Sequence, residues 1–447
     1  MEIIALLQCL CPTLTLTTIR QLSRIIFALL AMSGRVTMLG LSRWAGAGGS
    51  YRTIQRWFYT VIPWLSVLVQ FFRQHLFCAD DVYILAGDEV VVTKAGKQTF
   101  GLDRFFSSLL QRPVPSLAFF ALSLVSTRER SAFPVSVEQV VRTEAEKAAQ
   151  KAKAEAKKAL SPQPKRGRPK GSKNQNKAQV TLNPELQHIQ AMLQALLRLL
   201  TGWLSITYLA LDGHFGNNAA LQMTRQCGLH LISKLRSDSA LYFPYTGPQA
   251  KRGPRRKYGE RVDYHHRPVE CLKQTTVKDG IETCVYQATL LHKEFGQPLN
   301  GVIIIKTNLQ TQAWAHVILF SSDLTLAWDK LIDYYSLRLQ IEFNFRDAKQ
   351  YWGLEDFMNI QETAVTNAAS LSLFMVNVAE CLRRRLRPDD PEFGVLDLKA
   401  YYRGVKYVTE TLKMLQEKPD PNLVSEILRQ VSALGSIHPS PAPAPAY

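Results

Sequence analysis

Residues 329–354 read DKLIDYYSLRLQIEFNFRDAKQYWGL. The apolar residues of this stretch recur at helical spacing, which predicts a long helix from about Thr325 to Tyr351. At ~100° per residue, five side chains share one ~80° stripe of that helix, namely Tyr335, Arg338, Glu342, Arg346 and Lys349. An acid between cations suits a metal ion beside a nucleic-acid backbone, because the carboxylate can bind the ion while the cations hold phosphates.

Two further acids lie in apolar stretches upstream of this helix. Asp88 interrupts ILAGDEVVV and Asp212 ends the apolar part of YLALDGHF, and both stretches predict buried strands. A carboxylate in a hydrophobic strand is costly unless it is paired or binds a cation. Asp212 alone could equally cap the next helix, so the interpretation as a metal site depends on the three acids together.

Strands and helices alternate around these acids, which predicts an α/β protein with a mixed-sheet core and a β-rich insertion. The N-terminal residues lack strand alternation and predict helices. We therefore divide the chain into a helical, DNA-binding domain (1–78), three parts of the core (79–141, 184–238 and 321–385), a basic linker (142–183), the β-strand insertion (239–320), and C-terminal helices with a Pro/Ala-rich disordered tail (386–447).

Composition limits the class of protein. The 447 residues include 54 Lys and Arg against 37 Asp and Glu, a net charge of +17, which favours a polyanionic partner. The seven cysteines are scattered without a C-x-x-C pair, so neither a disulfide framework nor a thiolate zinc site is indicated, and a reducing cytoplasm is expected. The apolar run 57–72 is shorter than the ~20 residues that span a bilayer, so we expect no membrane partner.

Much of the positive charge lies in the linker. Between Arg142 and Val180 there are 12 Lys and Arg against 3 Glu. Within this segment, Arg166, Gly167, Arg168 and Pro169 resemble the core of an AT-hook, which lies in the narrow minor groove of A·T-rich DNA. The segment could instead contact phosphates without reading sequence. Both interpretations make DNA the partner.

Other candidate DNA contacts are spread along the chain. Arg52 and Arg56 follow the Gly-rich turn at 45–49, as in a helix-turn-helix, although a plain helical bundle with solvated arginines fits as well. Trp314 is a candidate base-stacking residue or a core tryptophan, and adjacent His265 and His266 point to opposite faces of a strand, which disfavours a shared metal. A basic loop that favours DNA-backbone contact over plain solvation contains Lys251, Arg252, Arg255, Arg256 and Lys257.

A family resemblance follows from these residues. Tyr335, Arg338, Glu342 and Lys349 reproduce the spacing Tyr-x-x-Arg-x-x-x-Glu-x-x-x-x-x-x-Lys, so the chain resembles the insertion sequence four group of bacterial DDE transposases. The stretch GDEVVVTKAGKQTFG resembles the surroundings of that family's first Asp, and LDGHF those of its second. The resemblance covers about 300 residues, from Asp81 to about Leu382. It implies an RNase H-like catalytic core in which Asp88, Asp212 and Glu342 are catalytic and hold two Mg²⁺ (or Mn²⁺) ions.

The resemblance also implies a function. A cut-and-paste transposase would cleave and join DNA at insertion-sequence ends through a hairpin intermediate. Tyr335, Arg338 and Lys349 would grip terminal phosphates and a flipped base. The implied partners are terminal-repeat and target DNA bound by a homodimer, in a bacterial cytoplasm near the nucleoid. An RNase H-fold nuclease that only cuts, and an inactive transposase-derived regulator that only binds DNA, are the alternatives.

Overall fold

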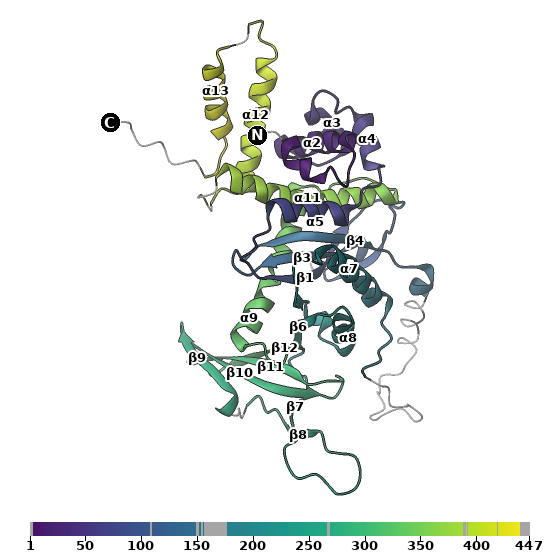
Figure 1. Cartoon of the computed structure of the whole chain (residues 1–447), viewed down its shortest axis with the longest axis vertical. Helices are drawn as coiled ribbons and strands as arrows, with labels where there is room; N and C mark the ends of the chain where they lie inside the picture. Colours follow the sequence, from purple (N-terminus) through teal and green to yellow (C-terminus); the bar gives the residue numbers. More distant parts are fainter. Residues whose placement is uncertain are drawn as a thin grey trace, which may run out of the picture.

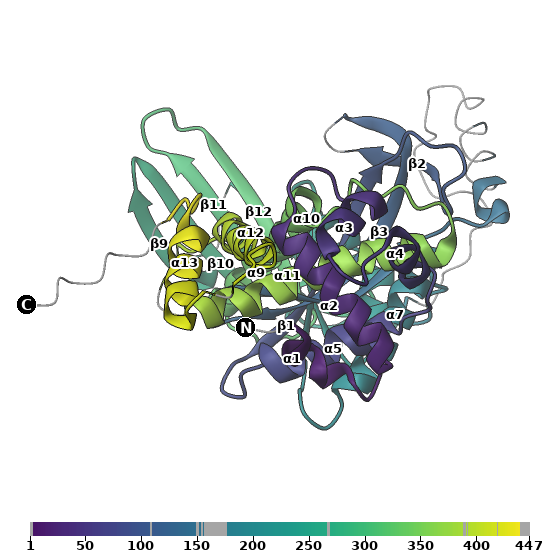
Figure 2. The ribbon, with the colours of Figure 1, turned by 90° about the horizontal axis from the view of Figure 1, so that it is seen from above.

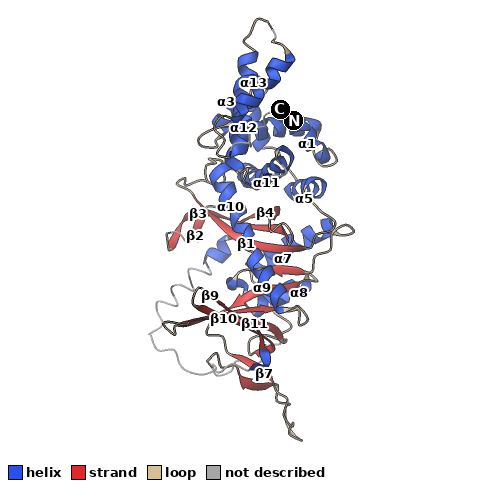
Figure 3. Cartoon of the chain, turned by 90° about the vertical axis from the view of Figure 1, so that its left-hand side faces the viewer, coloured by secondary structure: helices blue, strands red, loops and turns tan. Residues whose placement is uncertain are grey.

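The computed structural model describes residues 3–107, 110–148, 177–265, 269–387, 392–417 and 419–438, together with residues 152, 155 and 390. The AT-hook-like Arg166 and Arg168 lie outside these residues, as does His266. The molecule is elongated, with helices at one end, a sheet in the middle and a β-rich part at the other end (Figures 1 and 3).

Hydroxyl caps begin the N-terminal helices. Thr15, Thr37 and Ser50 each accept a backbone N–H from the first turn of the following helix, which satisfies a donor that has no partner within the helix. The last of these helices packs against the central sheet and the longest C-terminal helix. The elements are α1 (Ile3–Leu6), a 3₁₀ turn (Leu7–Leu10), α2 (Leu16–Ala31), α3 (Met38–Ala45), α4 (Tyr51–Phe58) and α5 (Trp64–His75).

The central sheet has the strand order β4-β3-β1-β5-β6. Its first three strands are antiparallel, β5 runs parallel to β1, and β6 runs parallel to β5. This mixed order confirms the expected RNase H-like α/β core. The strands are β1 (Tyr83–Thr93), β2 (Asp103–Ser107), which pairs with one end of β3, β3 (Arg112–Ser126), β4 (Ala132–Val140), β5 (Tyr208–Ala210) and β6 (His230–Leu235).

Helices cover this sheet on both sides. On one side lie α5 and α11 (Glu362–Leu386), and on the other lies α7 (Pro184–Leu200), while α8 (Asn218–Gln226) follows β5 and packs on β6 (Figures 1 and 3). By length and composition α11 could cross a membrane, but 83% of its apolar window is buried inside the fold, so it serves as a core helix. Beyond it, α12 (Val395–Leu412) and α13 (Pro421–Ala433) form a hairpin that projects from the molecule (Figures 1 and 2).

The β-rich insertion extends the central sheet. Its last strand pairs antiparallel with β6, where Ile318 lies opposite Leu235. The sheet therefore continues from the core into the insertion without a break in hydrogen bonding. The strands are β7 (Leu241–Pro244), β8 (Tyr258–Arg261), β9 (Leu272–Lys278), β10 (Ile281–His292), β11 (Leu299–Asn308) and β12 (Trp314–Ser321), with a 3₁₀ turn at Val269–Cys271.

The expected single helix from about Thr325 to Tyr351 is wrong. Two helices, α9 (Trp328–Leu337) and α10 (Gln340–Tyr351), replace it. At their junction the N–H groups of Leu339, Ile341 and Glu342 donate to carbonyls three residues earlier, at 3.1 Å each. Such 3₁₀ bonds advance the chain by ~120° per residue instead of ~100°, so side chains before and after the junction do not keep the angular spacing of one α-helix.

Candidate active site

Strand register brings Asp88 and Asp212 to the same level. In the parallel pair of β1 and β5, Ala86 lies opposite Ala210, and each acid is two residues further along its strand direction. Side chains at matching positions of neighbouring parallel strands point the same way, about 4.8 Å apart. Gly87 permits this approach, because a Cβ there would lie 2.8 Å from Cδ2 of Leu211, the residue before Asp212.

Glu342 joins them from the first turn of α10, which packs against β1. The link is Arg338, whose Nη1 lies 3.0 Å from Oδ2 of Asp88 and whose Nη2 lies 3.3 Å from Oε1 of Glu342. The Arg338 side chain is only 9% exposed, and its Nε is buried without a hydrogen-bond partner among the described residues. One guanidinium thus bridges two of the three candidate catalytic acids.

The electrostatics show that the three carboxylates act on one another. Burial raises the pKa of Asp88, the Arg338 guanidinium opposes this, and the charges of Asp212 and Glu342 raise it further. Tyr335 belongs to the same cluster, since its ring lies 5.8 Å from the Arg338 guanidinium and its pKa is raised by burial and by both aspartates. Asp212 also caps the 3₁₀ turn Gly213–Phe215, where its Oδ1 accepts the N–H of His214 at 3.1 Å.

The donor set suits a hard divalent cation, because all three acids offer carboxylate oxygens. In the described part of the chain, however, no three His, Cys, Asp or Glu side chains lie close enough to hold one ion. The guanidinium of Arg338 lies between Asp88 and Glu342 and bonds to both. These two carboxylates therefore share one positive charge in this structure. Their oxygen donors fit a divalent ion in kind.

The rest of the expected stripe faces elsewhere. Arg346 is exposed, donates to Asp347 at 3.1 Å and lies over the ring of Phe343. Lys349 donates to the carbonyl of Val91 at 3.1 Å and pairs with Glu355 at 3.2 Å. The structure thus brings Tyr335, Arg338 and Glu342 together with Asp88 and Asp212, and it directs Arg346 and Lys349 to partners outside this cluster.

Comparison with protein families identifies the domain. The model of the family described as DDE superfamily endonuclease matches residues 9–289. The chain belongs to this family. The matched residues include Asp88 and Asp212 and end before Glu342, whose place in the site depends on the contacts of Arg338. A search of curated proteins found no match.

Membership of the DDE superfamily endonucleases establishes the general chemistry. Enzymes of this family act on DNA and generally use divalent metal ions. The order of the acids, Asp then Asp then Glu, agrees with the name of the family. This DDE domain is therefore of the nuclease and transposase type.

The sequence did not reveal a second cluster beside Asp212 in the DDE domain. His214 Nε2 lies 3.4 Å from Oε1 of Glu185 in the first turn of α7, and this contact raises the pKa of His214, against its burial. On β1, burial and the Glu185 charge raise the pKa of Glu89. The position of His214 in LDGHF could have indicated that it lies near Asp212. Nothing in that motif indicates Glu185, which lies on α7.

The predicted DNA contacts of the 1–78 domain and of the basic loop lie at opposite ends of the molecule. On α4, Arg52 and Arg56 are exposed, while Trp57 and Phe58 of the same helix are buried. This arrangement agrees with a helix-turn-helix and with a plain bundle alike. The insertion carries the exposed basic residues Lys251, Arg252, Arg255, Arg256 and Lys257 between β7 and β8.

Trp314 is half-buried at the start of β12 instead of fully buried in the core. Its ring stacks on His316 at 5.3 Å and 18°, and His265 meets it edge-on at 4.6 Å. The ring of Tyr264 also stacks on His316, with ring centroids 4.4 Å apart. Aromatic rings therefore line up on this part of the insertion.

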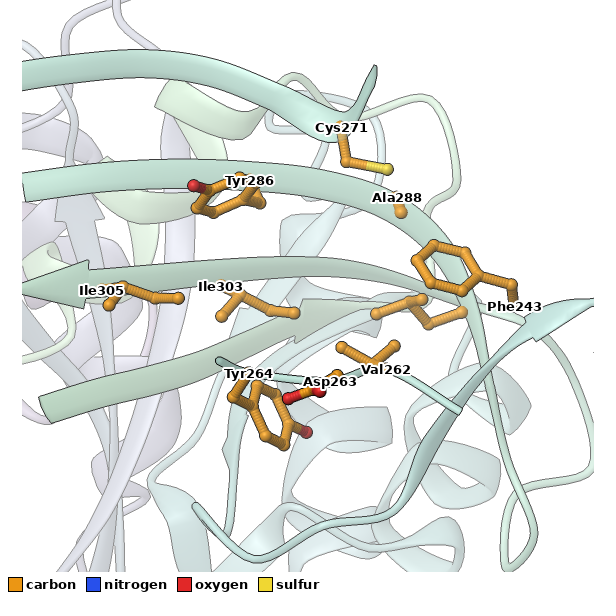
Figure 4. A pocket seen from close by; sticks show the side chains of 10 residues that line it. Phe243, Val262, Asp263, Tyr264, Cys271, Tyr286, Ala288, Ile303 and Ile305 are labelled. Atoms are coloured by element: carbon orange, nitrogen blue, oxygen red, sulfur yellow. The ribbon is translucent and has the colours of Figure 1, made fainter. Parts of the chain in front are cut away.

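A small apolar pocket in the insertion is unsuitable for a substrate. It lies between β10, β11 and the segment that follows β8, and its lining includes Val262, Tyr286, Ile303 and Ile305 (Figure 4). The enclosed volume is about 20 Å³, roughly what one water needs. We interpret it as a packing gap.

Proposed function

We propose that this chain is a DNA transposase of the insertion sequence four group, which cleaves insertion-sequence ends and joins them to target DNA. The observation that carries this proposal is the meeting of Asp88, Glu342 and Arg338 beside Asp212 and Tyr335. Tyr335, Arg338, Glu342 and Lys349 also match that group's spacing.

Asp88, Asp212 and Glu342 would hold two Mg²⁺ (or Mn²⁺) ions. When bound, these ions supply activation of the attacking oxygen and stabilisation of the leaving oxygen at phosphorus. Asp88 lies on β1, Asp212 caps the 3₁₀ turn after β5, and Glu342 lies on α10, so regular elements would hold the site. No side-chain nucleophile is required by this chemistry.

Cationic and aromatic side chains would hold the DNA end. Once Arg338 leaves the carboxylates, its fork can bind a phosphate in a bidentate manner, which a lysine cannot reproduce. Tyr335 lies next to it, and Lys349 and Arg346 would contact phosphates further along α10. A hairpin intermediate requires a base outside the stack, and the half-buried Trp314 offers a ring for it.

Outside the catalytic cluster, Arg52 and Arg56, the basic loop at 251–257 and the segment with Arg166 and Arg168 would bind DNA. Joining two ends at one target also requires two catalytic centres, so we propose a homodimer in a synaptic complex. The protein would act on the bacterial chromosome, in the cytoplasm.

The decisive experiment is Mg²⁺-dependent joining of a pre-cut DNA, carrying the ends of the mobile element that encodes this chain, to a target plasmid. Asp88→Asn, Asp212→Asn and Glu342→Gln should each reduce cleavage and joining to background while DNA binding persists, because the acids supply cation ligands. Asp347→Asn is the matched control on α10, since Asp347 pairs with Arg346 and should leave joining unchanged. Near-normal joining by any of the three acid variants would refute that assignment.

The same assay separates the alternatives. A nuclease would cut the ends in Mg²⁺ without joining them. A regulator would bind the ends with neither reaction, with or without the three acids.

A further inference from the structure

A wide groove separates the insertion from the core. Four segments line it: residues 177–181 before α7, the start of α8, the facing ends of β7 and β8, and the turn between β10 and β11. It encloses about 1660 Å³. In Figures 1 and 3 its strands and α8 lie on the side of the core away from the N-terminal helices.

One side chain ties the groove together. Asn218 donates from Nδ2 to the carbonyl of Lys177 at 2.8 Å and accepts the N–H of Gly296 through Oδ1 at 3.2 Å. It is the first residue of α8, close after Asp212 in the chain. Between them, Gly216 has no room for a side chain, because a Cβ would lie 2.1 Å from the carbonyl oxygen of Lys234. The groove is thus joined to the Asp212 loop by a tightly packed connection.

The lining is strongly basic. Lys177, Arg256, Lys257 and Lys293 are exposed, and Glu294 is the acid among the described lining residues. These cations are partly held in place. The Arg256 guanidinium lies 4.5 Å from the centre of the Tyr245 ring and its Nε donates to Tyr258 O at 3.2 Å. Lys293 lies 4.7 Å from the Tyr242 ring centre.

Pre-ordered cations along an open groove match a partner with regularly spaced negative charges. Cations held over aromatic rings lose less side-chain freedom when they meet an anion. We propose that this groove binds the phosphate backbone of duplex DNA that continues beyond the site of cleavage. The proposal rests on the proposed function and deepens it, because it joins Arg256 and Lys257 of the 251–257 loop with Lys177 and Lys293 into one DNA-binding groove.

The test is a binding measurement on the full chain with a fluorescent 40-base-pair duplex over a range of salt concentrations. In Lys257→Gln/Lys293→Gln, we expect the log–log salt slope to fall by ~0.9 for each lost phosphate contact, with affinity about tenfold or more weaker at 100 mM salt. The matched control is Lys273→Gln/Lys278→Gln, which removes the same charge from exposed positions of β9 in the same sheet. The control should keep the wild-type slope.

Two outcomes would overturn the proposal. An unchanged slope in the groove variant would show that the groove makes no phosphate contact, and an equal fall in both double variants would assign the effect to net charge. Poly-glutamate is also tested as a competitor of the labelled DNA for the wild-type protein. If it competes as strongly as unlabelled duplex does, the groove binds acidic peptide instead. Because Asp88→Asn leaves the groove intact, its slope should equal that of wild type. The binding test therefore remains readable even if the chain cleaves no DNA.

Discussion

Arg338 lies where the proposed chemistry needs a metal ion, between Asp88 and Glu342. The resemblance predicts that Arg338 grips a terminal phosphate of the DNA. If the acids hold the proposed ion, its contacts in the structure would make Arg338 a competitor of that ion for Asp88 and Glu342. A cation that must be displaced on metal binding would become free to hold the DNA end at that moment.

This competition predicts the effect of Arg338→Gln. Without DNA, Mn²⁺ should bind the variant roughly tenfold more tightly than wild type, because the ion no longer displaces a charge-assisted hydrogen-bonded partner. Calorimetric titration with Mn²⁺ measures this. Arg346→Gln on the same helix is the control, since Arg346 pairs with Asp347. Weaker Mn²⁺ binding by Arg338→Gln would contradict the competition.

At the scale of elements, Asn367 of α11 fixes the N-terminal helices to the core. Its Nδ2 donates to the carbonyls of Phe58 and Thr60 at 2.7 and 2.8 Å, and its Oδ1 accepts the indole N–H of Trp64 at 2.8 Å. The side chain is 1% exposed. Asn367→Ala should lower the free energy of unfolding by about 3 kcal/mol, since buried groups lose their partners. Urea denaturation measures this change, with Asn422→Ala at an exposed position as the control. A decrease in the free energy of unfolding below about 1 kcal/mol would show that water replaces these hydrogen bonds.

Lys399 should make the free energy of unfolding depend on pH, because it is buried where α12 packs on α2. Its Nζ donates to the carbonyl of Leu29 at 2.5 Å, and burial lowers the pKa of Lys399 to about 8 from its usual 10.5. Between these pH values the unfolded chain binds the proton and the folded chain does not, so stability rises with pH.

The measurement compares wild type with Lys399→Met in urea from pH 7 to 10. The difference in the free energy of unfolding, wild type minus variant, should increase by about 1.4 kcal/mol per pH unit above pH 8. Lys413→Met, at a lysine with 59% side-chain exposure, should show no such trend. A constant difference between wild type and Lys399→Met would mean that Lys399 keeps its proton throughout.

Sequence patterns predicted the elements better than the contacts between them. The strand that contains Asp88 and the strand that ends just before Asp212 follow from apolar runs, and the acids stand out because a charge in such a run is costly. The break between α9 and α10 could not be predicted, because SLRLQ contains no Pro or Gly and the tight turn coincides with the tertiary contacts of Arg338. The contact of Glu185 with His214 could not be predicted from the sequence either, because it joins residues of separate elements.

At the scale of the whole molecule, the candidate DNA contacts lie on both sides of the acid cluster. The N-terminal helices with Arg52 and Arg56 are at one end and the insertion with its basic groove is at the other, while β1, β5 and α10 lie between them (Figures 1 and 3). A DNA duplex that touches both ends would span the length of the molecule. This arrangement favours a long substrate over a short oligonucleotide.

The basic linker should contribute to the affinity for DNA. Replacing residues 162–176 by a Gly/Ser segment of equal length removes five Lys and Arg while it keeps the connection to Lys177. Affinity for duplex DNA should fall and the salt slope should decrease by ~0.9 for each lost phosphate contact. If Arg166 and Arg168 enter the minor groove, the loss should be larger on A·T-rich than on G·C-rich duplex, because the narrower groove concentrates negative potential. Fluorescence anisotropy with both duplexes decides between the interpretations. Equal losses of affinity on the two duplexes would mean that the linker contacts only phosphates. Unchanged affinity would exclude the segment from DNA recognition.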